Sequence, residues 1–162
     1  MKKRMMALVS MALAGAMVLP MAAMAGETEA AAAAADEGKV LNIEVWNEEF
    51  KSRITDHYPG YEKTDDTHGK IGDVTVNWII TPNDDNAYQN NLDTVLPGNA
   101  DASADDKVDM FLIEADYAKK YIDADANVAM PLKDLGITSD NLSKQYKYTQ
   151  DVVTDANGDL RG

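Results

Sequence analysis

The strongest candidate for a buried strand is the apolar run over residues 108–113, which contains a single acidic residue. Such a run is typical of a strand buried on both faces, in a sheet covered by helices. The carboxylates of Glu114 and Asp116 follow directly, and Tyr117, Tyr121 and Ile122 then recur at helical spacing. The pattern therefore predicts a central buried strand that delivers two acidic side chains to its carboxyl end before a helix begins.

Two further strand–helix units precede this run. Residues 40–46 and 74–80 alternate between apolar and polar side chains, and this period of two predicts strands. Apolar residues at helical spacing follow each strand and predict helices over residues 48–58 and 88–96, each closed by a Pro-Gly pair. Three successive strand–helix units predict an α/β fold, with right-handed crossovers that place the three strands in one parallel sheet.

The remaining segments predict less regular structure. Residues 62–73 are polar and contain glycines, so we expect a loop there, whereas residues 140–153 predict a last helix. Residues 155–159, with Asn-Gly at their centre, predict a hairpin turn. Only Leu160-Arg161-Gly162 follows this turn, and a hairpin with one arm missing indicates a fragment of a larger domain.

The first 38 residues have the composition of a targeting segment and a linker. Three basic residues at positions 2–4, an apolar stretch to position 19 and Ala-Met-Ala ending at Ala25 predict a signal peptide over residues 1–25. A retained membrane anchor is the alternative, and the short apolar run followed by Pro20 favours cleavage. Residues 26–38 are rich in alanine without apolar periodicity, which predicts a flexible linker.

Charge and composition exclude several partners. The chain has a net charge of −13, and removal of residues 1–25 takes three of its 15 basic residues and none of its 28 acidic ones, which leaves −16. Such a charge argues against nucleic acid and anionic membrane surfaces. No cysteine is present, so we expect neither a disulfide nor a lipid anchor, although residues 13–16 resemble a lipoprotein box. The sequence therefore predicts an exported, periplasmic or extracellular protein without a lipid anchor.

Four segments carry a resemblance to a known family: LNIEVWNEEF (41–50), WIITPNDDNAYQNNLD (78–93), DDKVDMFLIEADYAKKYI (105–122) and YTQDVVTDANGDLRG (148–162). In this order they resemble the N-terminal lobe of extracellular solute-binding protein family 1, the maltose-binding-like proteins of bacterial carbohydrate ABC transporters. The resemblance implies that residues 39–162 form part of a periplasmic-binding-protein-like lobe, with a parallel sheet flanked by helices. It also implies a monomer without catalytic residues, which binds a sugar or oligosaccharide and delivers it to the transporter's permease subunits.

The predicted carboxyl ends of the strands carry the groups that sugar sites use. Carboxylates and amides hydrogen-bond to hydroxyls, aromatic rings stack on the apolar face of a pyranose, and ligands of α/β sheets bind at this edge. By resemblance, Glu48 and Asp116 match the positions of the lobe that most often carry sugar-binding acids. The full set of candidate ligand-binding residues is Trp46, Asn47, Glu48, Asn86, Glu114 and Asp116.

Structural roles are the alternatives for these residues. Asn47 and Asp116 could each cap the helix that follows, and Glu48 could complement the dipole of its helix. Trp46 could pack in the core, where we also expect Tyr88, since it begins an apolar helical stripe.

Two other classes of function stay open at this stage. Glu48 with Glu114 or Asp116 could serve as the acid and base of a secreted glycoside hydrolase, and a surface adhesin module requires no distinctive residues. A calcium loop beginning at Asp123 is disfavoured because Val128 stands where the loop requires glycine. We therefore expect neither a metal nor a cofactor.

Overall fold

The computed structural model describes residues 38–162, of which residues 39–162 form one compact unit. The signal peptide predicted for residues 1–25, and all but the last residue of the linker predicted for residues 26–38, lie outside the described residues. The strands are β1 (Val40–Val45), β2 (Tyr61–Lys63), β3 (His68–Ile71), β4 (Val74–Ile80) and β5 (Val108–Phe111). The α-helices are α3 (Glu48–His57), α4 (Ala87–Val95), α5 (Ala118–Ile122) and α6 (Lys147–Val152), with short 3₁₀ helices over Asp84–Asn86, Leu96–Asp101 and Leu132–Leu135.

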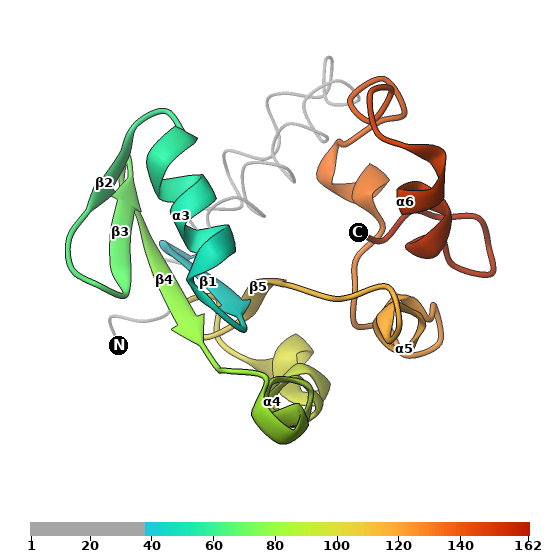
Figure 1. The fold of residues 1–162 in the computed structure, drawn as a ribbon, viewed down its shortest axis with the longest axis horizontal. Coiled ribbons are helices and arrows are strands. Elements are labelled where there is room, and N and C mark those ends of the chain that lie inside the picture. Colours follow the sequence, from blue (N-terminus) through green and yellow to red (C-terminus); the bar gives the residue numbers. More distant parts are fainter. Residues whose placement is uncertain (1–37) are drawn as a thin grey trace, which may run out of the picture. The chain divides into compact units, whose positions relative to one another are not determined.

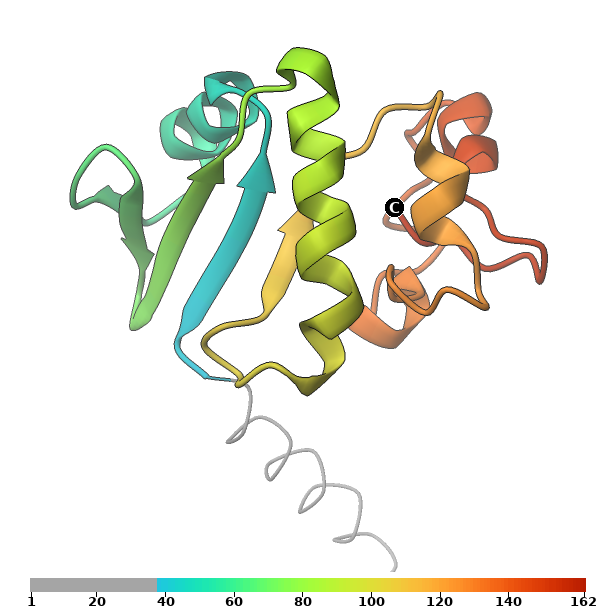
Figure 2. The ribbon, with the colours of Figure 1, turned by 90° about the horizontal axis from the view of Figure 1, so that it is seen from below.

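The five strands form one mixed sheet in the order β2-β3-β4-β1-β5. The three predicted strands, β4, β1 and β5, are parallel, and their arrows point the same way in Figure 2. Helix α3 covers one face of the sheet and α4 the other, as Figures 1 and 2 show together. The molecule is therefore an α/β fold with a mixed sheet flanked by helices.

The predictions of an all-parallel sheet and of a loop over residues 62–73 are wrong, because β2 and β3 form an antiparallel hairpin beside β4. Gly69 makes this hairpin possible: a Cβ atom added there would lie 2.1 Å from the Tyr61 hydroxyl, so the tyrosine ring needs the space over the glycine. The same hydroxyl accepts a hydrogen bond of 3.0 Å from Trp78 Nε1 on β4. The glycine that suggested a loop is thus a strand residue that permits close packing.

The prediction that residues 108–113 form the central strand is also wrong. β5 lies at the edge of the sheet and β1 next to it, with Val45 of β1 fully buried and Met110 of β5 43% exposed. The register between the two strands shifts after Asn42, and the Asp109 carboxylate accepts a 2.8 Å hydrogen bond from the Asn42 backbone nitrogen at this irregularity. An apolar run alone does not distinguish a central strand from an edge strand.

Two apolar clusters occupy the two faces of the sheet. The cluster on the α3 face has Ile43, Val45, Val76 and Trp78 as its buried members, with Phe50 and Ile54 of α3 packed against it. The cluster on the α4 face joins α4 to α5, and its buried members are Tyr88, Leu92, Leu96 and Tyr121. Each side of the sheet therefore has its own core.

Polar residues of β1 are buried beneath α4 and are fully engaged. The Asn77 side-chain amide donates to Asn42 Oδ1 (2.9 Å), and the Asn42 amide donates to the backbone oxygens of Asp105 (2.9 Å) and Lys107 (2.8 Å). Glu44 accepts a 3.1 Å hydrogen bond from Asn91 of α4. This polar ladder explains why the alternation in the first two strands is more polar than a sheet covered on both faces requires.

The Tyr88 hydroxyl joins the ends of β1 and β5. It lies within donating distance of the backbone oxygens of Glu44 (3.0 Å) and Leu112 (2.9 Å), and it accepts from the Leu112 backbone nitrogen at 3.0 Å. The ring is fully buried, as expected from the sequence. One side chain of α4 thus hydrogen-bonds to backbone groups at the carboxyl ends of two neighbouring parallel strands.

The C-terminal segment is organised by a hairpin turn, as the sequence predicts. Thr154 and Leu160 form an antiparallel bridge, and the Asp155 carboxylate accepts from the backbone nitrogens of Asn157 and Asp159, both at 2.9 Å. The other carboxylate oxygen is bonded to Arg161 Nε at 2.7 Å in a buried ion pair. The helix predicted for residues 140–153 is shorter than expected, since only α6 forms and turns precede it.

Replacement of Tyr88 by phenylalanine should lower the free energy of unfolding by about 1–3 kcal/mol, because the ring stays but the Leu112 backbone oxygen loses its donor, and Glu44 O and Leu112 N keep only their hydrogen bond to each other. Urea unfolding followed by circular dichroism measures the change. Tyr58→Phe is the matched control, since Tyr58 is 48% exposed, and should change stability by less than about 0.5 kcal/mol. Equal effects of the two substitutions would contradict the role assigned to the Tyr88 hydroxyl.

Glu44→Gln should make the protein more stable near neutral pH. Burial raises the pKa of Glu44 above 4.5, against the opposing hydrogen bond from Asn91. The folded state therefore binds this proton more tightly than the unfolded state, and the ionised carboxylate lowers stability as the pH rises through the folded pKa. The advantage of glutamine should shrink as the pH falls through the raised pKa of Glu44, where the wild-type side chain becomes neutral. Urea midpoints from about pH 4 to 8 test this, with exposed Glu62→Gln as the control, and a pH-independent difference would refute it.

Candidate functional site

The carboxyl ends of the three parallel strands lie at one edge of the sheet. Strands β4, β1 and β5 are adjacent and parallel, and hydrogen bonds continue beyond them: Thr81 N donates to Val45 O (2.9 Å) and Leu112 N to Glu44 O (3.2 Å). All six candidate residues follow one of these strands: Trp46, Asn47, Glu48, Asn86, Glu114 and Asp116. Ligands of open α/β sheets bind at such an edge.

A cleft of about 250 Å³ opens between the start of α3 and the segment after β5. We call it the β1 cleft, because its floor follows directly from the end of β1. Its aromatic and apolar walls are Trp46, Phe50 and Leu112, and the polar groups at its rim are Asn47, Glu49 and Arg53.

Local packing fixes the walls of the β1 cleft. The Trp46 ring meets the Tyr88 ring edge-on, with 5.4 Å between centroids, and the Phe50 ring lies 6.3 Å from that of Trp78. At the rim, Glu49 and Arg53 form an exposed ion pair of 3.0 Å, four residues apart on α3. The cleft therefore combines a rigid aromatic surface with a carboxylate and a guanidinium that water surrounds and a ligand can reach.

Asn47 has the structural role that the sequence offered as an alternative, and it also reaches the β1 cleft. Its side-chain oxygen accepts a 2.9 Å hydrogen bond from the Glu49 backbone nitrogen, which caps α3. The side-chain amide group remains exposed at the rim. A ligand could accept from this amide without breaking the cap.

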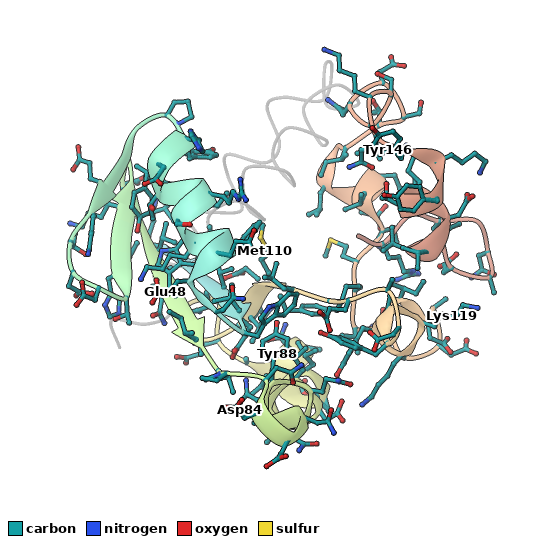
Figure 3. The ribbon with its side chains drawn as sticks, in the orientation of Figure 1. Glu48, Asp84, Tyr88, Met110, Lys119 and Tyr146 are labelled. Atoms are coloured by element: carbon teal, nitrogen blue, oxygen red, sulfur yellow. The ribbon has the colours of Figure 1, made fainter. Side chains whose placement is uncertain are left out.

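Glu48 lies in the first turn of α3 but does not line the β1 cleft. Its carboxylate forms an ion pair of 2.7 Å with Lys51, whose ammonium also donates to the Asp66 backbone oxygen in the β2–β3 connection. The side chain is well exposed, and Figure 3 labels it beside α3. It therefore links the helix to the hairpin while keeping its carboxylate accessible.

The other three candidates are exposed on the segments that follow β4 and β5. The Tyr117 backbone nitrogen donates to Glu114 O at 3.2 Å, and Tyr117 rather than Asp116 occupies the residue before α5, with no side-chain cap. Asn86 adopts a left-handed conformation (φ 61°) next to Asp85 (φ 49°). Backbone strain of this kind is stored preferentially at functional sites.

Burial perturbs several ionisable groups, and most of these serve the fold. Desolvation raises the pKa values of the Tyr88 and Tyr117 hydroxyls. It also raises the pKa values of the Glu44 and Asp109 carboxyls, which accept hydrogen bonds from Asn91 and the Asn42 backbone. The Tyr117 hydroxyl is buried without a hydrogen-bond partner among the described residues. The Asp109 carboxyl thus bonds β5 to β1 and the Glu44 carboxyl bonds β1 to α4, and neither lines the β1 cleft.

Neither a metal site nor a membrane-spanning helix is found within residues 38–162. No three side chains of histidine, cysteine, aspartate or glutamate in this part of the chain are placed to share a metal ion. The Asp123 carboxylate instead accepts from the Asp125 backbone nitrogen at 2.9 Å. No helix in the described part has the length and apolar composition needed to cross a bilayer.

Sequence reasoning missed Glu49, Phe50, Arg53 and Leu112 as residues of the site. The spacing of Glu49 and Arg53 was a usable signal, because residues four apart share one face of a helix. The position of Leu112 in the cleft could not be predicted from the sequence, because it depends on the pairing of β5 with β1.

No protein-family model matches the chain, and comparisons with curated proteins and with solved structures give no match. The chemistry of the strand edge and of the β1 cleft is therefore the basis for a functional assignment.

Asn47→Ala should lower the free energy of unfolding by about 0.5–2 kcal/mol, because the Glu49 backbone nitrogen loses its cap. Asn47→Asp is the matched control: its carboxylate keeps the cap and favours the helix dipole, so stability should stay near that of the wild type. Thermal unfolding of the three proteins measures both changes. Equal losses in the two variants would show that the cap does not contribute.

Proposed function

We propose that the protein is the substrate-binding component of a carbohydrate ABC transporter. In this proposal it is exported, acts as a monomer, binds a sugar or oligosaccharide outside the membrane without chemical change, and delivers it to permease subunits. The resemblance of four segments of the chain to extracellular solute-binding protein family 1 suggests this role, and the α/β fold with three parallel strands is compatible with it.

The observation that carries the proposal is the chemistry of the β1 cleft. Trp46 is half-buried against the α4-side core but also lines the cleft, where its ring can stack on the C–H groups of a pyranose. The Glu49 carboxylate accepts hydrogen bonds from sugar hydroxyls, and the Arg53 guanidinium and Asn47 amide donate to them. Adjacent hydroxyls of a sugar need this combination of acceptors and donors around an apolar surface.

The size of the β1 cleft limits the ligand it can hold. Its volume of about 250 Å³ is below the roughly 300–1,000 Å³ of typical small-molecule sites. The cleft therefore accommodates about one sugar ring, and further rings would extend over the exposed side chains of the same sheet edge. Glu48, Asn86, Glu114 and Asp116 are available there for such contacts. Because the cleft is open to water, we expect affinities for single sugars in the roughly millimolar range.

A titration with a panel of neutral mono- and oligosaccharides tests the proposal. Isothermal calorimetry and the tryptophan fluorescence, to which Trp46 and Trp78 both contribute, should show saturable binding of at least one sugar. Chromatography of the sugar afterwards should show no turnover. Glu49→Gln should weaken this binding by roughly tenfold, because a charge-assisted hydrogen bond is lost. Glu62→Gln, exposed on β2, is the matched control and should bind as the wild type does.

Two results would refute the proposal. Cleavage of a glycoside by the pure protein, abolished by Glu114→Gln, would favour the hydrolase alternative. An unchanged affinity in Glu49→Gln and in Trp46→Ala would show that the β1 cleft is not the sugar site.

A further inference from the structure

The segment that leads into α6 exposes two aromatic rings stacked on each other. The centroids of Tyr146 and Tyr148 are 5.8 Å apart with 18° between the ring planes. Their side chains are among the most exposed large apolar groups in the described residues, at 74% and 70%. Tyr146, labelled in Figure 3, lies immediately before α6, and Tyr148 lies in its first turn.

The backbone holds this pair in place. Two residues apart on a helix, side chains do not face each other, but Tyr146 is extended (φ −68°, ψ 138°) and so turns its ring back over Tyr148. The Thr149 hydroxyl and backbone nitrogen both donate to the Tyr146 backbone oxygen, at 2.7 and 3.1 Å. The Gln150 amide donates to Leu142 O at 3.0 Å, which ties α6 to the preceding turns. The rings are therefore presented by an ordered support.

The surroundings of the rings indicate an uncharged partner. Lys147, between the two tyrosines, is bonded to Asp151 at 2.5 Å, and residues 140–151 carry no net charge, because their two lysines, Lys144 and Lys147, balance Asp140 and Asp151. Neither phenolic hydroxyl has a protein hydrogen-bond partner within residues 38–162, and both can donate to and accept from a ligand. An aromatic surface with free hydroxyls on a segment without net charge suits neutral sugar rings, which present C–H groups and hydroxyls together.

We propose that Tyr146 and Tyr148 form a stacking platform for neutral pyranose units of a polysaccharide or oligosaccharide. Each ring covers only the inner face of the other, so the outer face of each ring stays open to a sugar unit. The platform shares no residue with the β1 cleft. The choice of sugars as the ligand class rests on the proposed function. The platform adds a second contact region, which favours binding of oligosaccharides and polysaccharides over single sugars.

Native gel electrophoresis through neutral soluble polysaccharides, a glucan, a mannan and a xylan in separate gels, tests the platform. At least one polymer should retard the wild type, and the Tyr146→Ala/Tyr148→Ala variant should bind it roughly tenfold more weakly. Tyr58→Ala, which removes a single exposed tyrosine, is the matched control and should keep wild-type retardation. The Glu49→Gln variant should also remain retarded, because its platform is intact, although it binds single sugars weakly in calorimetry.

A second measurement does not depend on the folding of a variant. In nuclear magnetic resonance spectra of the wild type, the ring protons of Tyr146 and Tyr148 should shift or broaden when a neutral oligosaccharide of the retarding polymer is added. Unchanged tyrosine signals, equal retardation of the wild type and the double variant, or no retardation in any gel would each overturn the platform. If the wild type is retarded but binds no single sugar in calorimetry, the β1 cleft is refuted as the sugar site and the platform is left standing. Association of the tyrosines with a second protein copy, seen as dimers lost in the double variant, would also overturn it.

Discussion

The fold and the cleft both depend on how Tyr88 occupies the space between α4 and the sheet. Its hydroxyl bonds to the backbone of Glu44 on β1 and of Leu112 just beyond β5, and its ring supports the edge of Trp46. Trp46 and Leu112 are two walls of the β1 cleft. One buried side chain therefore sets the distance between the ends of two parallel strands and, through them, the shape of the candidate site. A buried hydroxyl that meets three backbone groups leaves the sheet little freedom to open at this edge.

The polar ladder along β1 supplies the matching constraint at the other end of the strands. Asn42 is bonded to Asn77 on one side and to the Asp105 and Lys107 backbone on the other. A slip of one residue would remove these bonds and turn the buried Val45 to the polar face. Apolar packing stabilises burial of a strand but does not determine which strand it pairs with. The hydrogen bonds of these side-chain amides, in contrast, form in one register only. The order β4-β1-β5, on which the common edge depends, is thus specified by buried polar groups. An argument from hydrophobic burial alone would treat these groups as unfavourable.

The sequence was sufficient for the parts of the fold that local pattern determines. Strand β4 has the predicted bounds, the helices after β1 and β4 begin and end within two residues of their predicted bounds, and the turn at residues 155–159 forms as its Asn-Gly centre indicates. Long-range packing decided the rest. The β2–β3 hairpin depends on Tyr61 lying over Gly69, and the edge position of β5 depends on which strand pairs with β1. Neither contact leaves a periodic signal in the segments concerned.

The candidate site illustrates the same division between spacing and packing. Glu48 and Glu49 are adjacent acids at the start of one helix, and the family resemblance selected Glu48 as a candidate and not Glu49. In the structure Lys51 holds Glu48 toward the hairpin, while Glu49 pairs with Arg53 on the face that borders the β1 cleft. Successive positions on a helix differ by about 100° in direction, so one residue determines which surface an acid serves. At the start of a helix, the direction of each side chain decides which carboxylate a ligand meets first. The presence of acidic residues after a strand does not decide it.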